Sequence, residues 1–407
     1  MDDIIIIGGG IAGLYTALKL NKNKKVLLFE KNNYYGGRIY TDSFYVNNNK
    51  YTVEAGAARI LESHRLMINL IKMMNLYSKV VKIDSHIDFI PSKNYSLKRY
   101  SNQTGYDFID LLLKKKFKKK DLQQISFEQL LKQNYTDDEV KFILDSCGYY
   151  GDLKIQNAYD ALYVFKNAVR TDKMYCILSG GFGQLINKMV KVVKEKHRCF
   201  LNSECRQIFY NDGIFTVNIN DKKVFTKNLV LAIPQPNLLD LKFLKPYFPL
   251  LKSINCVSLL RIYSIYKEKD VWFDGLKKVT TNNKLGYIIP INPKKGLIMT
   301  SYTDYTRTNY WVNKNKNKKE LDLALKKNIK DVFNIKTKSP SEIKFYHWPC
   351  GVGLWKPGYD SNRITDKVIK PDKIPLYIIG ENYSKYQGWM EGALDSAYKC
   401  VKHIMID

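Results

Sequence analysis

The stretch Ile4-Ile-Ile-Ile-Gly8-Gly-Gly10-Ile-Ala-Gly13 decides the fold of this 407-residue chain. Consecutive isoleucines are typical of a central parallel strand, because such a strand is buried on both of its faces. The glycines then fit the turn from a strand into a helix. Gly8 permits the tight turn, Gly10 lets the backbone approach a pyrophosphate, and Gly13 lets the helix pack closely on the strand.

The residues that follow complete a strand–helix–strand unit. Apolar residues from Leu14 to Leu20 stand at helical spacing, and the apolar run Val26–Phe29 predicts a second buried strand. Glu30 ends that strand, where its carboxylate can accept hydrogen bonds from the hydroxyls of an adenosine ribose. The unit therefore predicts a Rossmann-like dinucleotide site, with positive potential from the helix N-terminus at the pyrophosphate.

The rest of the chain alternates between helical and strand-like segments. Residues 64–167 are mostly helical by apolar spacing, residues 199–234 have a period of two, and strands continue over 259–266 and 285–291. A helix carries Leu321, Leu325 and Ile329, and the last helix is expected from about Glu391 to His403. Because neither a repeat nor a linker separates these segments, we expect two interleaved domains.

Composition excludes several other classes. The chain has 66 basic against 39 acidic residues, a formal net charge of +27 that can attract nucleic acid or an anionic membrane. Its lysines, however, stand in Lys- and Asn-rich runs that begin at Lys114 and Asn313 and are typical of solvated surface. Because no zinc-ligand spacing or RNA-binding aromatic signature accompanies them, nucleic acid is not an expected partner.

The cysteines and the first residues bear on the compartment. Seven scattered cysteines without a Cys-x-x-Cys pair indicate free thiols in a reducing compartment. The apolar run Ile4–Ile7 is too short for a membrane span, and no basic segment precedes it. We expect a soluble, cytoplasmic protein without a metal site, and a homodimer stays open.

Two further motifs indicate which dinucleotide is bound. Gly36-Gly37-Arg38 follows the Glu30 strand, and Ile378-Ile-Gly380-Glu381 precedes Gly388-Trp389-Met390-Glu-Gly-Ala393 near the C-terminus. In this order the motifs resemble those of the flavin-containing amine oxidase superfamily, which includes monoamine, L-amino-acid and polyamine oxidases. The resemblance implies FAD as the cofactor, with Arg38 near its pyrophosphate, Glu381 at its ribityl chain and Met390 at the helix end that faces the flavin ring.

The resemblance extends over residues 2–403 and implies an α/β fold. It predicts a Rossmann-like FAD-binding domain of the GR2 type, interleaved with an α+β substrate domain. The FAD-binding domain is expected at residues 1–60, 174–236 and 374–407. The substrate domain is expected at residues 61–173 and 237–373, with its helical part at about 61–173. Cys205 stands where the family places a small residue whose backbone meets the adenine.

The resemblance also implies the reaction. Hydride leaves the carbon that bears the amine and reaches flavin N5, the imine hydrolyses to an aldehyde or keto acid, and O2 reoxidises the flavin with release of H2O2. The protein has to orient a small amine, keep it neutral and exclude water. Trp389 is the expected aromatic wall of the amine site, and Trp355 is the expected opposite wall.

Arg59 bears on which amine is oxidised. Gly56-Ala-Ala-Arg59 resembles the segment in which L-amino-acid oxidases bind the substrate carboxylate through a bidentate arginine. An L-amino acid is therefore the expected substrate. A structural ion pair of Arg59, with Glu54 as the partner, is the alternative.

Two positions depart from the pattern of the family. Arg261 stands where the family usually has a lysine that holds a water near flavin N5, so Arg261 either orders this water differently or serves the substrate. Cys350 lies at a spacing similar to that of the cysteine that some monoamine oxidases bond to the flavin, but its neighbours differ. Non-covalent FAD is therefore expected.

Three hypotheses follow from these residues. The first is an L-amino-acid oxidase with Arg59 at the carboxylate, and the second is a monoamine or polyamine oxidase with a structural Arg59. The third is a flavin-binding interaction protein with little catalysis, which Arg261 and the basic surface keep open.

Overall fold

The first sheet of the molecule is built around the isoleucine strand. The computed structural model describes residues 2–97, 100, 103–169 and 174–406. Seven strands form this sheet in the order β10 (Cys205–Asn211), β11 (Ile214–Ile219), β12 (Lys222–Leu231), β1 (Asp2–Ile7), β2 (Val26–Phe29) and β9 (Arg198–Phe200), with β18 (Leu376–Ile378) beside the end of β12. The pairings of β1 with β2 and β12, of β2 with β9 and of β12 with β18 are parallel.

The alternation of side chains along β1 explains why all four isoleucines are buried. Ile4 and Ile6 belong to one apolar cluster and Ile5 and Ile7 to another, one on each face of the sheet. Four helices contribute to the first cluster: α1 (Ile11–Lys19), α2 (Arg65–Met73), α9 (Gly183–Lys196) and α15 (Met390–Ile406). The second cluster includes residues of α10 (Gln235–Asp240), α11 (Phe248–Leu251) and α14 (Ser361–Ile369). The predicted doubly covered strand–helix–strand unit is confirmed.

A second sheet carries the other half of the molecule. Its order is β17 (Glu342–Trp355), β13 (Ile254–Ile265), β16 (Leu297–Asp304), β15 (Tyr287–Asn292), β14 (Val279–Thr280) and β7 (Asp88–Phe89). These pairings are antiparallel except for β14 with β7, so the sheet is mixed. On its outer side lies α13 (Lys318–Phe333), and α12 (Thr308–Lys314) contacts α13 and β13. α13 is the helix predicted from Leu321, Leu325 and Ile329.

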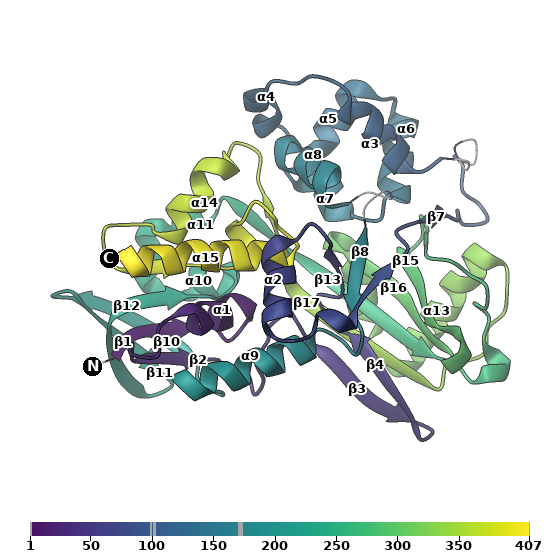
Figure 1. Cartoon of the computed structure of the whole chain (residues 1–407). Helices are drawn as coiled ribbons and strands as arrows, with labels where there is room; N and C mark the ends of the chain where they lie inside the picture. Colours follow the sequence, from purple (N-terminus) through teal and green to yellow (C-terminus); the bar gives the residue numbers. More distant parts are fainter. Residues whose placement is uncertain (1, 98–99, 101–102, 170–173, 407) are drawn as a thin grey trace.

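A helical group lies above the second sheet and the end of α15 (Figure 1). It comprises α3 (Gly105–Leu113), α4 (Lys119–Gln124), α5 (Phe127–Asn134), α6 (Asp137–Ser146), α7 (Tyr150–Ile155) and α8 (Ala158–Asn167). Trp389 and Tyr287 pack into the apolar cluster of this group, so the helices rest on both halves of the molecule.

Small sheets connect the halves. One is the hairpin of β3 (Thr41–Val46) and β4 (Asn49–Glu54), and the other joins β5 (Ile60–Leu61), β8 (Tyr175–Leu178) and β6 (Val80–Ile83). The strands of the first sheet come from residues 2–29, 198–231 and 376–378, and those of the second from 88–89, 254–304 and 342–355. The chain therefore crosses between the two sheets several times, and its last helix, α15, lies beside α1 (Figure 1). No described helix has the length and hydropathy that a bilayer crossing requires.

The strand-to-helix turn offers a test of the fold that is independent of any ligand. A Cβ atom at Gly13 would overlap the carbonyl oxygen of Gly8, whereas one at Gly10, whose φ is −71°, would meet nothing within 4 Å. We expect Gly13→Ala to lower the unfolding free energy of the cofactor-free protein by roughly 1–3 kcal/mol, because the helix must move off the strand. Gly10→Ala is the matched control and should leave it unchanged. Equal denaturant midpoints for the two variants would contradict the assigned role of Gly13.

Candidate functional site

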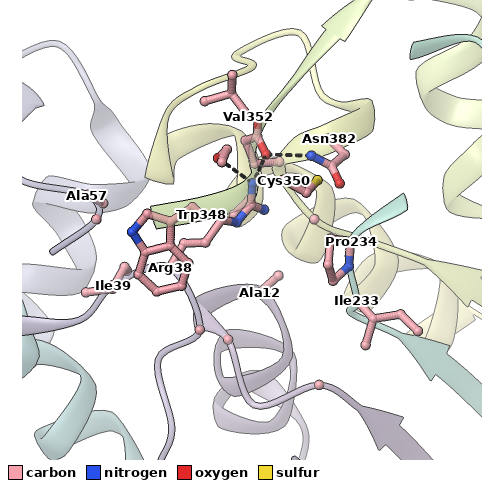
Figure 2. A pocket seen from close by; sticks show the side chains of 18 of the residues that line it. Ala12, Arg38, Ile39, Ala57, Ile233, Pro234, Trp348, Cys350, Val352 and Asn382 are labelled. Carbon is pink, nitrogen blue, oxygen red and sulfur yellow. Dashed lines mark hydrogen bonds and ion pairs between the residues drawn. The ribbon is translucent and has the colours of Figure 1, made fainter. Parts of the chain in front are cut away.

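A single cavity of about 730 Å³ runs between the two sheets. Its wall contains most of the residues that the sequence singled out: Gly8, Gly10, Glu30, Gly36, Gly37, Arg38, Arg59, Cys205, Arg261, Cys350, Gly380, Glu381, Trp389 and Met390. Gly13 and Trp355 do not line it. Figure 2 shows part of this wall, with Ala12 at the helix α1 below, Ile233 and Pro234 on one side, and Trp348 on the other.

One end of the cavity fits a dinucleotide. Gly8 has a φ of +108°, and a Cβ there would overlap the carbonyl oxygen of Ala232, so the turn needs glycine. The space beside Gly10 is open, and helix α1 begins there without a side-chain cap. Open space at an uncapped helix N-terminus suits the phosphates of a dinucleotide, since the first amides of a helix point toward an anion.

Glu30 lies at this end with part of its hydrogen bonding already used. Its Oε2 accepts from the backbone N–H of Gly9 at 2.7 Å, and its Oε1 accepts from that of Asn32 at 2.8 Å. A carboxylate has about four acceptor positions. Glu30 therefore fixes the glycine turn and still has acceptor positions for a ligand in the cavity.

Arg38, labelled in Figure 2, forms an ion pair with Glu381, and both residues line the cavity. Nη1 of Arg38 donates to Oε2 of Glu381 at 2.6 Å and to the carbonyl oxygen of Gly351 at 2.8 Å. Oε1 of Glu381 accepts from the backbone N–H groups of Gly353 at 3.0 Å and Gly388 at 2.8 Å. The pair thus ties the N-terminal segment to β17 and to the start of the C-terminal motif.

This network changes the role expected for Glu381. A fourth donor, the side-chain amide of Asn382, reaches Oε2 at 2.9 Å. All four acceptor positions of the carboxylate are then engaged by the protein. Glu381 lies at the cavity, but it positions Arg38 and two backbone segments and has no free acceptor for a ribityl chain.

Trp389 and Arg59 form the far end of the cavity. Trp389 stacks in parallel on Tyr175, with 6.3 Å between ring centres, and meets the edge of His64 at 4.9 Å. The guanidinium of Arg59 lies 4.2 Å from the ring centre of Tyr175 and 5.7 Å from that of Trp389, and its Nη2 donates to the hydroxyl of Tyr149. Aromatic faces attract a guanidinium, so this stack fixes its plane.

Arg59 has no acidic partner within the described residues. Glu54, the partner considered from the sequence, instead accepts from the hydroxyl of Thr41 and the N–H of Phe182, so that ion pair does not form. The pKa of Arg59 is raised above its ordinary value: burial acts to lower it, but the nearby phenol oxygens, Tyr149 first, act against burial. A positive charge therefore faces the cavity.

Burial makes His64 unsuitable as a base. Its Nδ1 accepts from the N–H of Leu61 at 3.3 Å, and burial lowers the pKa of the imidazole to about 4. The ring is neutral at physiological pH and packs against Trp389. His64 is therefore a packing and hydrogen-bonding residue.

Arg261 lies in the wall opposite the glycine turn. Its Nη1 donates to the carbonyl oxygen of Glu54 at 2.9 Å, and its guanidinium is 5.0 Å from the ring centre of Tyr302. Its buried Nε has no hydrogen-bond partner in the described part of the chain. An unpaired buried donor beside a cavity indicates a contact that a ligand or an ordered water completes.

The structure corrects the position of Trp355. Its side chain is 1% exposed inside the cluster beneath the first sheet, where its indole N–H donates to the carbonyl oxygen of Ser384 at 3.1 Å. β17 carries extra residues opposite β13, between Trp348 and Val352, and this bulge alters which side chains face the cavity. Trp348 lines the cavity instead, so Trp355 is not the opposite wall.

The expectation of free thiols is wrong for two cysteines. Cys256 on β13 and Cys350 on β17 form a disulfide, with their Cα atoms 5.1 Å apart. The other five cysteines are free. Because the sulfur of Cys350 is bonded within the protein, this disulfide supports the expectation of a flavin held without a covalent link.

Comparison with known proteins agrees with this geometry. A Rossmann-like NAD(P)-binding domain matches residues 6–74, and the family described as flavin containing amine oxidoreductase matches residues 124–405. The chain belongs to the flavin-containing amine oxidoreductase family. Members of this family use a flavin, and the glycine turn and the open space beside Gly10 fit FAD. A predicted bifunctional amine oxidase of Dictyostelium discoideum is 24% identical over 98% of this chain, which spans 46% of that relative.

Solved structures share the fold at lower identity. Putrescine oxidase bound to putrescine has a TM-score of 0.79 at 15% identity, covering 100% of this chain and 99% of its own. Cyclohexylamine oxidase from Brevibacterium oxydans has a TM-score of 0.76 at 16% identity, covering 99% and 98%. The α/β fold with an interleaved substrate half, expected from the sequence, is confirmed.

Sequence reasoning missed several cavity residues. Tyr149, Asp152, Tyr302 and Asp304 line the wall near Arg59 and Arg261. They come from the start of α7 and the end of β16, whose meeting depends on tertiary packing. None of them stands in a motif, so no sequence signal pointed to them.

The open space at Gly10 tests the cofactor site separately from the fold. Gly10→Ala should keep the unfolding midpoint of the cofactor-free protein and weaken FAD binding at least about tenfold, because the new methyl group occupies the path of the phosphates. FAD titration followed by flavin fluorescence would measure the change. Unaltered FAD affinity would place the dinucleotide elsewhere.

Proposed function

We propose that this protein is an FAD-dependent oxidase of an α-amino acid and that Arg59 binds the substrate carboxylate. The observation that carries the proposal is the half-buried guanidinium of Arg59, which lines the cavity without an acidic partner among the described residues. A buried charge is costly unless it is paired. A carboxylate from the substrate would complete that pair in bidentate geometry.

The surrounding residues support the orientation of such a substrate. Bound FAD would take hydride from the carbon that bears the amine and pass electrons to O2, with release of H2O2. Trp389 would form one wall of the amine site, and the stack of Arg59 on Tyr175 and Trp389 would hold the carboxylate beside that wall. The aromatic lining excludes water from the reacting carbon.

We further propose roles for the residues at the cofactor end. The amides of the Gly8–Gly13 turn would bind the phosphates, and Glu30 would accept from the ribose. Arg38 would lie near the pyrophosphate, held there by Glu381. Cys205 lines the cavity and would lie near the adenine. At Gly36, Gly37 and Gly380 the cofactor would approach the backbone closely. Met390 begins the helix that would face the flavin ring.

Amines without a carboxylate are the second candidate class, as the names of the putrescine and cyclohexylamine oxidases suggest. In that case Arg59 would have a structural role. An anaerobic screen of amino acids and amines, followed by loss of the visible flavin absorbance, separates the two classes. If no amine bleaches the flavin, the third hypothesis, a flavin-binding interaction protein, holds.

Replacing Arg59 tests the carboxylate role directly. For an amino acid that reduces the flavin, Arg59→Met should raise KM by about 100-fold, the effect of losing a buried charge-assisted pair, while kcat falls much less. Reduction by the corresponding amine, which lacks the carboxylate, should change little.

Arg65 offers a matched control, since it is an exposed arginine near Arg59 in the sequence. Arg65→Met removes the same charge and should leave both substrates unaffected. An equal loss for the amino acid and the amine in Arg59→Met would show that Arg59 only supports the structure.

A further inference from the structure

We propose that the cavity selects an α-amino acid with a cationic side chain: Arg59 binds the carboxylate, and Asp152 binds the distal ammonium group. This inference rests on the proposed function, because it assigns the rest of the same substrate. Amino acids of the lysine and ornithine type have this pair of charges. The inference depends on Asp152, a residue that no sequence motif singled out.

Asp152 is a carboxylate without a protein partner. It lies in the first turn of α7 and lines the cavity. Among residues 2–97, 100, 103–169 and 174–406, no other residue forms a hydrogen bond or ion pair with its side chain. Its carboxylate is half-buried at the cavity and has no protein cation to pair with, so a cation from a ligand would stabilise its ionised form.

Asp304 differs from Asp152 although it lies beside it. Its Oδ1 accepts from the N–H of Tyr150 at 3.1 Å, and its Oδ2 accepts from that of Gly151 at 2.9 Å. These bonds hold the N-terminus of α7 against the end of β16. Asp304 therefore positions the helix turn that carries Asp152, and it adds a second negative charge to this end of the cavity.

The electrostatic surroundings of Asp152 agree with a cation site. Burial first, then the neighbouring Asp304 and Glu381, raise its pKa to about 7. No protein cation is among the groups that act on it. An ammonium group placed here would favour the ionised carboxylate and would thereby gain binding free energy.

Two tyrosines connect Arg59 and Asp152 along the cavity wall. Tyr149 accepts from Arg59 and directly precedes α7, the helix whose first turn contains Asp152. Both Arg59 and Asp152 act on the pKa of Tyr302, a third residue of the same wall. The two side chains therefore line the same cavity close to a common tyrosine.

The charge of Arg59 also acts on Lys278, which does not line the cavity. Burial, and then the charge of Arg59, lower the pKa of its amine well below the usual range, and its nitrogen lies 5.5 Å from the ring centre of Tyr287. The lowered pKa shows that the charge of Arg59 disfavours a second cation nearby, so an anionic group would be stabilised beside Arg59 and a cationic group would be repelled. The substrate is thus oriented with its carboxylate toward Arg59 and its ammonium toward Asp152.

The experiment compares three ligands of similar length on the FAD-loaded protein. L-Lysine carries both charged ends, L-norleucine lacks the distal ammonium, and cadaverine lacks the carboxylate. Dissociation constants are measured by calorimetry on the oxidised protein under anaerobic conditions, and flavin reduction is followed separately. We expect lysine to bind at least about 50-fold more tightly than either analogue, since each lacks one buried charge pair.

Asp152→Asn should weaken lysine binding by about 50-fold and leave norleucine binding within about threefold, so that the preference is lost. Asp274→Asn, at an exposed position, is the matched control for loss of a negative charge and should preserve the preference. FAD content and the unfolding midpoint check that the variants fold. Asp152→Glu, which keeps the charge, should retain part of the preference.

The outcomes separate this inference from the proposed function. The inference is overturned if the wild-type protein binds lysine and norleucine equally. It is also overturned if Asp152→Asn weakens the binding of both ligands alike, because Asp152 would then bind the α-amine that both ligands share. If lysine binds through Asp152 but no ligand bleaches the flavin, the oxidase function fails while the dipolar site stands. Flavin reduction by norleucine and lysine with equal efficiency would leave the oxidase and remove the selectivity.

Discussion

The ion pair of Arg38 and Glu381 holds together the segments from which the cavity is built. Arg38 follows the glycine turn, Gly351 and Gly353 belong to β17 of the second sheet, and Gly388 precedes the last helix. These segments are distant in the sequence, and Glu381 is only 7% exposed. Loss of Arg38 would leave the buried carboxylate of Glu381 without its cation, which costs roughly 3–5 kcal/mol for a buried pair. The cavity wall therefore depends on both residues at once.

The same constraint accounts for the interleaved course of the chain. Helix α15 packs beside α1 on one face of the first sheet, while the residues just before it bind the second sheet through Glu381. In addition, Glu391 in the first turn of α15 accepts from the N–H groups of Leu66 and Met67 at the start of α2. The N-terminal and C-terminal segments thus form one wall of the cavity together.

The sequence predicted the parts of the site that are local. The turn from Gly8 to Gly13 carries its geometry within a few residues, and Trp389 stands in a motif that begins a helix, so both were found. The sequence also points to Glu381, but it does not predict how many donors reach its carboxylate. These donors come together only in the folded chain and belong to Arg38, Gly353, Asn382 and Gly388.

Two expectations, the position of Trp355 and the free thiols, are wrong because they depend on how strands pair. Trp355 is the tryptophan that the sequence predicts for the wall opposite Trp389. The bulge in β17 changes which residues of this strand face the cavity, so Trp348 lines it and Trp355 does not. Cys256 and Cys350 lie 94 residues apart, and only the pairing of β13 with β17 brings them together. Strand register depends on the whole sheet, so a pattern along one strand does not fix it.

The site contains a positive and a negative side chain that have no ionic partner in the protein and that a ligand with both charges can pair. Arg59 and Asp152 are each half-buried without an ionic partner in the described chain, and Tyr149 contacts Arg59 at the start of the helix that carries Asp152. Partial burial of an unpaired charge is unfavourable for the empty protein. A dipolar ligand relieves both penalties at once, whereas a ligand with one charge relieves only one of them. The formal net charge of +27 would repel cations from the molecule at long range, so selection of a cationic side chain has to come from this local acidic end.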